Sequence, residues 1–96
     1  MREIRQAHEY ERWFARLRDR EARARILARV RRLQLGNPGD VEPVGEGVSE
    51  LRIPYGPGYR IYFVTTDDAV VVLLAGGDKK TQRRDIVKAK KLARGL

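Results

Sequence analysis

The sequence contains no cysteine and only one histidine, His8. Without cysteine there are no disulfides, no thiolate metal ligands and no cysteine nucleophile. A single histidine cannot supply the histidine pair of a ribonuclease A type reaction, and its position at the start of a predicted helix favours a structural role. The acidic residues are scattered or lie in turns, where they form no cluster suited to a metal ion. We therefore expect a protein with no metal and no other cofactor.

Long apolar runs are also missing. A membrane helix needs about 18 or more consecutive apolar residues, and no stretch approaches that length. The arginine-rich start lacks the apolar segment that follows the basic part of a signal peptide. These absences predict a cytoplasmic protein that does not enter a membrane. With 96 residues, of which 42% are hydrophobic, the chain is expected to form one domain over residues 1–96.

Positive charge is what the sequence has in excess, with 21 Lys and Arg against 13 Asp and Glu and a formal net charge of +8. Residues 1–35 carry eleven basic and five acidic side chains, and residues 76–96 carry eight basic and two acidic ones. Residues 36–51 carry four acidic and no basic side chains, and are expected to form an acidic loop. Basic clusters bind polyanions because they release counterions from phosphate backbones. Nucleic acid is therefore the first partner to consider.

Apolar periodicity predicts three helices. The first covers residues 8–17, where apolar side chains recur at helical spacing, and the second covers residues 20–35 and ends at Gly36. The third covers residues 82–94, with Thr81 as its N-terminal cap.

The strands are predicted from alternation. A short strand is expected at residues 3–6, and residues 48–53 and 59–64 alternate in the way that is typical of a hairpin. The run AVVVLLA at residues 69–75 is apolar on both faces, which indicates a strand covered on both sides, and the glycines at 76–77 end it. The order β-α-α-β-β-β-α predicts an α+β domain, with two N-terminal helices and a C-terminal helix packed on a small, mainly antiparallel sheet.

The register of the hairpin follows from the segment YGPGYRIYF, residues 55–63. Pairing Ile53 with Tyr59 turns the apolar residues of both strands to one face, which is the core. The same register places Arg52 directly opposite Arg60 on the other face. Two facing arginines repel each other by an amount comparable with the roughly 0.2–1 kcal/mol of a favourable cross-strand pair. Stability alone therefore gives no reason for the pair.

The arginine pair has two open explanations. In the first, Glu50 neutralises the arginines or both side chains point into solvent. In the second, the guanidinium groups bind an anion, and Tyr62 beside Arg60 supplies a stacking or hydrogen-bonding surface that suits a nucleotide.

The segment GGDKKT at residues 76–81 joins the last strand to the last helix. It is not a phosphate loop, because Val72 occupies the position of the first glycine of that motif. Its lysines lie at a helix N-terminus, where cations are disfavoured unless an anion or Asp78 offsets them. If the last strand lies beside the hairpin, the basic residues converge on one concave site. The candidate site then comprises Arg52, Arg60, Lys79 and Lys80, with Tyr55, Tyr59 and Tyr62 as RNA-binding residues.

A cation-rich site without a metal suits one reaction on RNA. The 2′-hydroxyl attacks the adjacent phosphate, arginines stabilise the charge that develops, and a lysine or tyrosine moves protons. Such an enzyme is a metal-independent endoribonuclease.

Four segments carry a family resemblance, and together they cover nearly the whole chain. They are EIRQ at residues 3–6, LGNPGDVEPVGEGVSELRI at 35–53, YGPGYRIYF at 55–63 and LLAGGDKKTQRRDIVKAKKLA at 73–93. The sequence resembles the RelE/ParE superfamily of toxins from type II toxin–antitoxin modules, and within it the HigB-like addiction module killer proteins. The resemblance implies a RelE-like fold.

The resemblance also implies an activity and partners. Such toxins cleave mRNA, commonly on the ribosome, and a cognate antitoxin neutralises them. In the HigB-like branch the antitoxin is a small helix-turn-helix, HigA-like protein that represses its own operon, so operator DNA would be contacted only through the antitoxin. The family's arginines match Arg60 and Arg52, and its basic residues after the last strand match Lys79 and Lys80, which implies a catalytic role for all four. Residues 82–87 hold neither the tyrosine nor the histidine that transfers protons in well-studied members, so no general acid or base is assigned.

Other functions fit the same resemblance. ParE-type toxins of the superfamily inhibit DNA gyrase instead of cutting RNA, and a toxin can also serve mainly as a co-repressor bound to its antitoxin. The two basic segments alone would support nonspecific nucleic-acid binding.

Overall fold

The computed structural model describes residues 1–96 and has the α+β arrangement predicted from the sequence. Its elements are β1 (Ile4–Gln6), α1 (His8–Arg16), α2 (Arg20–Gln34), β2 (Val41–Gly45), β3 (Val48–Ile53), β4 (Tyr59–Thr65), β5 (Val71–Asp78), the 3-10 turn η1 (Lys79–Thr81) and α3 (Gln82–Arg94). The strands form one sheet in the order β1-β5-β4-β3-β2, in which β1 is parallel to β5 and the other neighbours are antiparallel. No helix has the length and apolar composition needed to span a bilayer.

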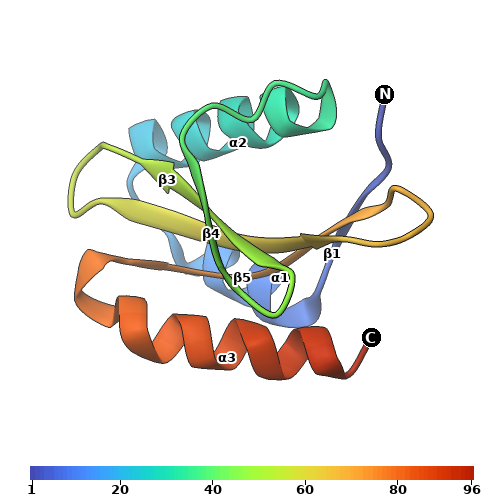
Figure 1. Cartoon of the computed structure of the whole chain (residues 1–96). Coiled ribbons are helices and arrows are strands. Elements are labelled where there is room, and N and C mark those ends of the chain that lie inside the picture. Colours follow the sequence, from blue (N-terminus) through green and yellow to red (C-terminus); the bar gives the residue numbers. More distant parts are fainter.

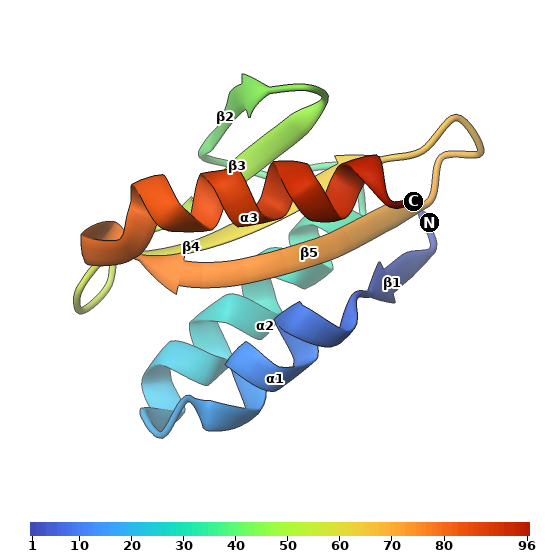
Figure 2. The ribbon, with the colours of Figure 1, turned by 90° about the horizontal axis from the view of Figure 1, so that it is seen from below.

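The sheet lies between two layers of helices. Helices α1 and α2 cover one face, and α3 runs along the other (Figure 1 and Figure 2). The core cluster under α1 and α2 includes Val71 and Leu73 of β5, and the cluster under α3 includes Val72 and Leu74 of the same strand. Alternate residues of β5 thus enter different clusters, which explains why this strand is apolar on both faces.

The hairpin of β3 and β4 has the predicted register. Ile53 pairs with Tyr59, and Arg52 pairs with Arg60. The side chains of Leu51 and the other alternate residues enter the core cluster under α1 and α2, as the apolar pattern requires. The two arginines therefore lie on the face that α3 partly covers.

Residues 41–45 form strand β2, where the sequence predicts part of an acidic loop. The segment contains Pro43, which has no N–H to donate, and the pairing with β3 shifts register between Pro43 and Gly45. Proline and acidic residues are depleted in strands, so the local sequence does not indicate one, but an edge position tolerates them. This strand brings Glu42 within reach of Arg52.

Strand β5 continues through Gly76 and Gly77 to Asp78, beyond the predicted end at residue 75. A methyl group on Gly76 would overlap the Trp13 indole, and one on Gly77 would overlap the Asp85 carboxylate. The two glycines therefore allow Trp13 and Asp85 to pack closely against opposite faces of the strand. They do not end the strand, although the sequence predicted that they would.

Asp78, and not the predicted Thr81, caps the turn that leads into α3. Its Oδ1 accepts hydrogen bonds from the backbone N–H groups of Lys80 (2.9 Å) and Thr81 (3.3 Å). Thr81 precedes α3 but makes no side-chain cap there, and its hydroxyl donates to Asp85 Oδ2. The Asp78 carboxylate therefore supplies negative charge at the helix N-terminus that carries the lysines.

Candidate functional site

The candidate site lies where the start of α3 meets strands β3 and β4. Helix α3 runs along β4 and β5, whereas the hairpin of β2 and β3 extends beyond it (Figure 2). Strand alternation turns Glu50, Arg52, Arg60 and Tyr62 to this side of the sheet. The residues closest to α3 are buried beneath it, and those nearer β2 reach the surface.

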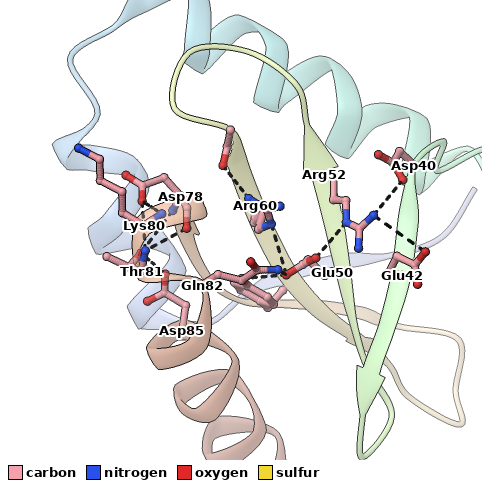
Figure 3. A network of polar contacts seen from close by, with 12 residues as sticks. Asp40, Glu42, Glu50, Arg52, Arg60, Asp78, Lys80, Thr81, Gln82 and Asp85 are labelled. Carbon is pink, nitrogen blue, oxygen red and sulfur yellow. Dashed lines mark hydrogen bonds and ion pairs between the residues drawn. The ribbon is translucent and has the colours of Figure 1, made fainter.

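Glu50 is the centre of a polar network, and its side chain is 1% exposed (Figure 3). Arg52 Nε donates to Oε1 at 3.0 Å, while the Tyr62 hydroxyl and Gln82 Nε2 donate to Oε2 at 3.1 and 3.0 Å. Arg60 Nε lies 3.5 Å from the same Oε2. One buried carboxylate therefore connects β3, β4 and the first residue of α3.

The pKa of Glu50 reflects two opposing effects. Burial raises the pKa, but the hydrogen bonds from Gln82, Arg52 and Tyr62 and the charge of Arg60 together lower it below its ordinary value. Glu50 is therefore ionised at neutral pH, and its charge offsets the repulsion between the two arginines. Of the sequence-based explanations, neutralisation by Glu50 is the one that the geometry supports for the pair itself.

Arg60 is held by its surroundings and reaches the surface only at one edge. Its side chain is 14% exposed, and its Nη1 donates to the Gly58 carbonyl at 3.2 Å. It lines a small cavity of about 140 Å³ together with Arg52 and Tyr59. With Nε beside Glu50 and one Nη1 hydrogen on Gly58, the remaining N–H groups of the guanidinium are those available to an anion.

Arg52 and Arg60 line the same small cavity and approach opposite oxygens of Glu50, but Arg52 also faces acidic residues that the sequence did not indicate. Its guanidinium is turned toward β2, where Nη1 lies 4.0 Å from Asp40 Oδ1 and 3.9 Å from Glu42 Oε1 (Figure 3). The hydrogen bond to Glu50 and the charges of Glu42, Glu50 and Asp40 outweigh desolvation and raise the pKa of Arg52. These neighbours were not predicted, because the sequence did not indicate β2, and the catalytic role of Arg52 stays a prediction.

Lys79 and Lys80 are exposed at the start of α3 and line a groove of about 400 Å³. Its lining residues are Lys79, Lys80, Thr81, Gln82, Arg83 and Arg84, none of which is acidic. A methyl group on Gly58 would lie 3.6 Å from Arg60 Nη1 and 3.7 Å from Lys79 Cβ. The Arg60 guanidinium and the base of the Lys79 side chain therefore both lie beside Gly58. The Lys80 side chain extends away from Arg60 (Figure 3), so it does not converge with Arg60 as predicted.

The three candidate tyrosines have other contacts. Tyr62 is fully buried beneath α3, and burial together with the Glu50 charge raises its pKa, so its predicted role as an RNA-stacking residue is wrong. The Tyr55 hydroxyl donates to Asp19 Oδ2 at 3.0 Å, and its ring lies against the Arg25 guanidinium. Tyr59 packs edge-on against Trp13 and is one of the residues that line the small cavity. RNA binding by Tyr55 and Tyr59 stays a prediction.

Two polar residues of this region were not predicted from sequence. Gln82 joins Glu50 across 32 positions of the chain, and no spacing rule connects a helix-starting glutamine to a strand carboxylate. Asp85 is buried in α3 on a helix that otherwise carries basic residues. No group of three or more His, Asp or Glu side chains is placed to hold a metal ion.

Comparison with known proteins places this chain in a family. The family described as Phage derived protein Gp49-like (DUF891) matches residues 12–94. The chain belongs to the Gp49-like family. A protein of Haemophilus influenzae, described as an uncharacterized protein, is 45% identical over 87 residues, which cover 91% of this chain and 88% of that protein.

Solved structures share the fold of this Gp49-like protein. Free E. coli toxin RelE, carrying two arginine-to-alanine substitutions, matches with a TM-score of 0.74 and 11% identity over 94% of this chain and 96% of that chain. The E. coli RelBE toxin–antitoxin complex matches with a TM-score of 0.67 and 15% identity, over 81% of this chain and 96% of that chain. The toxin–antitoxin complex RelBE2 from Mycobacterium tuberculosis matches with a TM-score of 0.54 and 22% identity, over 81% of this chain and 98% of that chain. At these identities the likeness shows the fold, and the predicted RelE-like fold is confirmed.

Proposed function

We propose that this Gp49-like protein is the toxin of a type II toxin–antitoxin module and acts in the cytoplasm as a ribosome-associated, metal-independent endoribonuclease on mRNA. The observation that supports this most directly is the RelE-like fold combined with an acid-free basic groove beside Arg60. A strand of RNA needs such a run of cations to hold its phosphates.

In the proposed reaction, the available N–H groups of Arg60 bind the scissile phosphate and stabilise the charge that develops as the 2′-hydroxyl attacks. Glu50 and the Gly58 carbonyl fix the orientation of that guanidinium, so the donors are arranged before the substrate arrives. Arg52 supports the network from the other side of Glu50, and Lys79 and Lys80 hold the neighbouring phosphates. No side chain at the site is assigned as general acid or base.

The proposed partner is a small helix-turn-helix antitoxin of the HigA type, which would contact operator DNA on behalf of both proteins. Two of the similar structures are toxin–antitoxin complexes, which is the support for an antitoxin. The net charge of +8 makes the free protein electrostatically suited to an acidic partner surface as well as to RNA.

Growth and mRNA integrity after induction in a bacterial host test the proposal. We expect wild-type expression to arrest growth and to produce new mRNA 5′ ends at codon-related positions, and Arg60→Ala to relieve both, since it removes the phosphate donors. Arg20→Ala, an exposed arginine outside the site, serves as the charge-matched control and should stay toxic. Circular dichroism checks that Arg60→Ala is folded, and undiminished toxicity of a folded Arg60→Ala protein would refute the proposal.

The alternative functions have different signatures. A ParE-like gyrase inhibitor would induce the SOS response and leave mRNA intact. A co-repressor would change operator binding by the antitoxin without arresting growth. The fold alone is compatible with both, so the same induction experiment with an SOS reporter separates them from RNA cleavage.

A further inference from the structure

A second cavity lined by arginines lies between α2 and the end of β3. It measures about 200 Å³, and its lining residues are Arg25, Ala28, Arg29, Arg32, Ile53 and Pro54. None of these residues is acidic. The three arginines follow one another at i, i+4 and i+7, so they lie on one side of α2. We refer to this space as the α2 cavity.

The spacing of the three arginines has no explanation in the stability of the helix. Like charges three and four residues apart destabilise a helix. Burial, and after it the charge of Arg32, lowers the pKa of Arg29, and the opposing effect of Asp40 does not cancel them. An anion bound among the arginines would relieve this repulsion.

Arg29 is held by backbone carbonyls and has no carboxylate within ion-pair distance. Its Nη1 donates to the carbonyl of Arg52, and its Nη2 donates to the carbonyls of Pro38 and Asp40. Its Nε is buried and has no hydrogen-bond partner. Carbonyl groups orient a guanidinium but leave its charge uncompensated. Arg29 therefore gives the α2 cavity a positive charge that is fixed in place.

Arg32 and Arg25 can contact a ligand in this cavity. Arg32 is exposed, and its side chain forms neither a hydrogen bond nor an ion pair. Arg25 pairs with Glu21 at 2.9 Å, but both side chains are more than half exposed, so the pair is weak. The Arg25 guanidinium also lies over the Tyr55 ring, at 4.6 Å from its centroid. All N–H donors of Arg32 are therefore free, and Arg25 can exchange its partner at little cost.

The α2 cavity adjoins the cavity that Arg60 lines. Ile53 and Pro54 line both of them, and Pro54 is exposed. The pairing of β2 with β3 ends at Leu51, so no strand covers β3 at Ile53. In Figure 1 the connection between β3 and β4 lies between α2 and the start of α3. An RNA strand held at Arg60 can thus pass over Pro54 and reach the α2 cavity.

We propose that the α2 cavity binds a phosphate of the RNA strand that Arg60 holds. Arg32 and Arg25 donate to the phosphate oxygens, because guanidinium groups match phosphate with paired N–H donors, and Arg29 adds its charge from behind. The polar side chains of the cavity are all donors, so it positions the RNA backbone and reads no base. Its continuity with Arg60 favours a nucleic-acid strand over an acidic peptide. This inference rests on the proposed RNA function and extends the RNA site from the start of α3 to α2.

RNA oligomers of increasing length test the inference. Oligouridylates with 2′-O-methyl groups are used, because they lack the attacking hydroxyl and remain uncut. Short oligomers, which occupy only Arg60 and the groove at α3, should bind wild type and Arg32→Ala equally. Longer oligomers should bind Arg32→Ala about tenfold more weakly, in keeping with the loss of one charge-assisted hydrogen bond. For them the salt slope should become shallower by about 0.7, the value for one phosphate of a single strand, and Arg32→Lys should restore it.

The control is Arg31→Ala, which removes the same charge from the adjacent exposed residue of α2, outside the cavity. It should bind oligomers of every length as wild type does. Equal weakening by Arg31→Ala and Arg32→Ala, no effect of Arg32→Ala at any length, or the same effect at all lengths would each overturn the inference. Polyglutamate that needs Arg32 for binding, while long RNA does not, would assign the cavity to an acidic protein instead. Because no cleavage is measured, absence of nuclease activity would refute the proposed function and leave this result readable.

Discussion

At the scale of single residues, Glu50 determines how the site is built. It is a fully buried carboxylate with donors from three other side chains, and the Arg60 charge lies 3.5 Å away. Removing one partner of such a network leaves the others buried and uncompensated, which is more damaging than losing an exposed ion pair. The network therefore fixes Arg60 at a site where RNA is proposed to bind.

Glu50→Gln keeps the shape of the side chain and removes its charge. We expect a loss of about 2 kcal/mol in the free energy of unfolding at pH 7, because charge-assisted hydrogen bonds become neutral ones. The folded-state pKa of Glu50 is lowered, so its contribution is fully present above its unfolded pKa and is lost as pH falls through the folded value. The stability difference between wild type and Glu50→Gln should therefore shrink below about pH 4.

Urea unfolding at several pH values between neutral and acid measures this difference. Glu42→Gln is the matched control, since Glu42 is 53% exposed and only 3.9 Å from Arg52, and should change stability by less than about 0.5 kcal/mol. A difference between wild type and Glu50→Gln that stays constant with pH would show that the Glu50 charge does not stabilise the fold.

At the scale of secondary-structure elements, Arg29 ties α2 to the strand that carries the site. Its Nη1 donates to the Arg52 carbonyl at 2.5 Å, and its Nη2 donates to the carbonyls of Pro38 and Asp40 at 3.0 and 3.3 Å. Burial and the charge of Arg32 lower the pKa of Arg29. One guanidinium therefore fixes the connection after α2 and the end of β3.

Arg29→Lys tests whether the forked shape of the guanidinium matters. A single ammonium group cannot reach carbonyls in both directions, so we expect Arg29→Ala to lose about 2 kcal/mol of stability and Arg29→Lys to recover less than half of that. Thermal or urea unfolding measures the loss, with the exposed Arg32→Lys expected to be near neutral. Full recovery by lysine would mean that charge alone, and not the fork, holds this connection.

The sequence predicted those elements whose cause is local. The three helices, the β3–β4 register and the double-sided burial of β5 follow from periodicity, because each depends on residues close in the chain. Strand β2 and the extension of β5 through Gly76 and Gly77 did not follow. Both depend on tertiary context, an edge position that accepts Pro43 and the packing of Trp13 and Asp85 against the glycines.

The candidate site was predictable to a similar degree. Alternation placed Arg60 on the correct face, but the direction of each guanidinium depends on acidic residues brought from elsewhere in the chain. Glu42 lies 3.9 Å from Arg52, and Gln82 joins Glu50 from 32 positions along the sequence. Such contacts leave no periodic signal in the sequence. The prediction that four basic residues converge on one site therefore overestimated the number that do, because the Lys80 side chain extends away from Arg60.

At the scale of the whole molecule, the fold places acidic and basic side chains at different parts of the surface. The amino-acid composition shows only their sum, a net positive charge. Strand β2 and its flanks bring Asp40 and Glu42 beside Arg52, which neutralises that side of the sheet. The groove at the start of α3 has basic and neutral lining residues only. An RNA strand should therefore approach across the start of α3 and avoid β2, whatever the net charge of the chain.

Salt dependence distinguishes a local RNA site from attraction by net charge. For single-stranded nucleic acid, the logarithm of the binding constant falls with the logarithm of salt concentration with a slope of about −0.7 per neutralised phosphate. Replacing both Lys79 and Lys80 by alanine should therefore make the slope shallower by about 1.4, because two phosphate contacts are lost. The control Arg18→Ala with Arg20→Ala removes the same charge from exposed positions outside the groove and should leave the slope unchanged. Equal changes in the two double variants would mean that RNA is attracted by total charge, as in nonspecific binding, and that the groove at α3 has no special role.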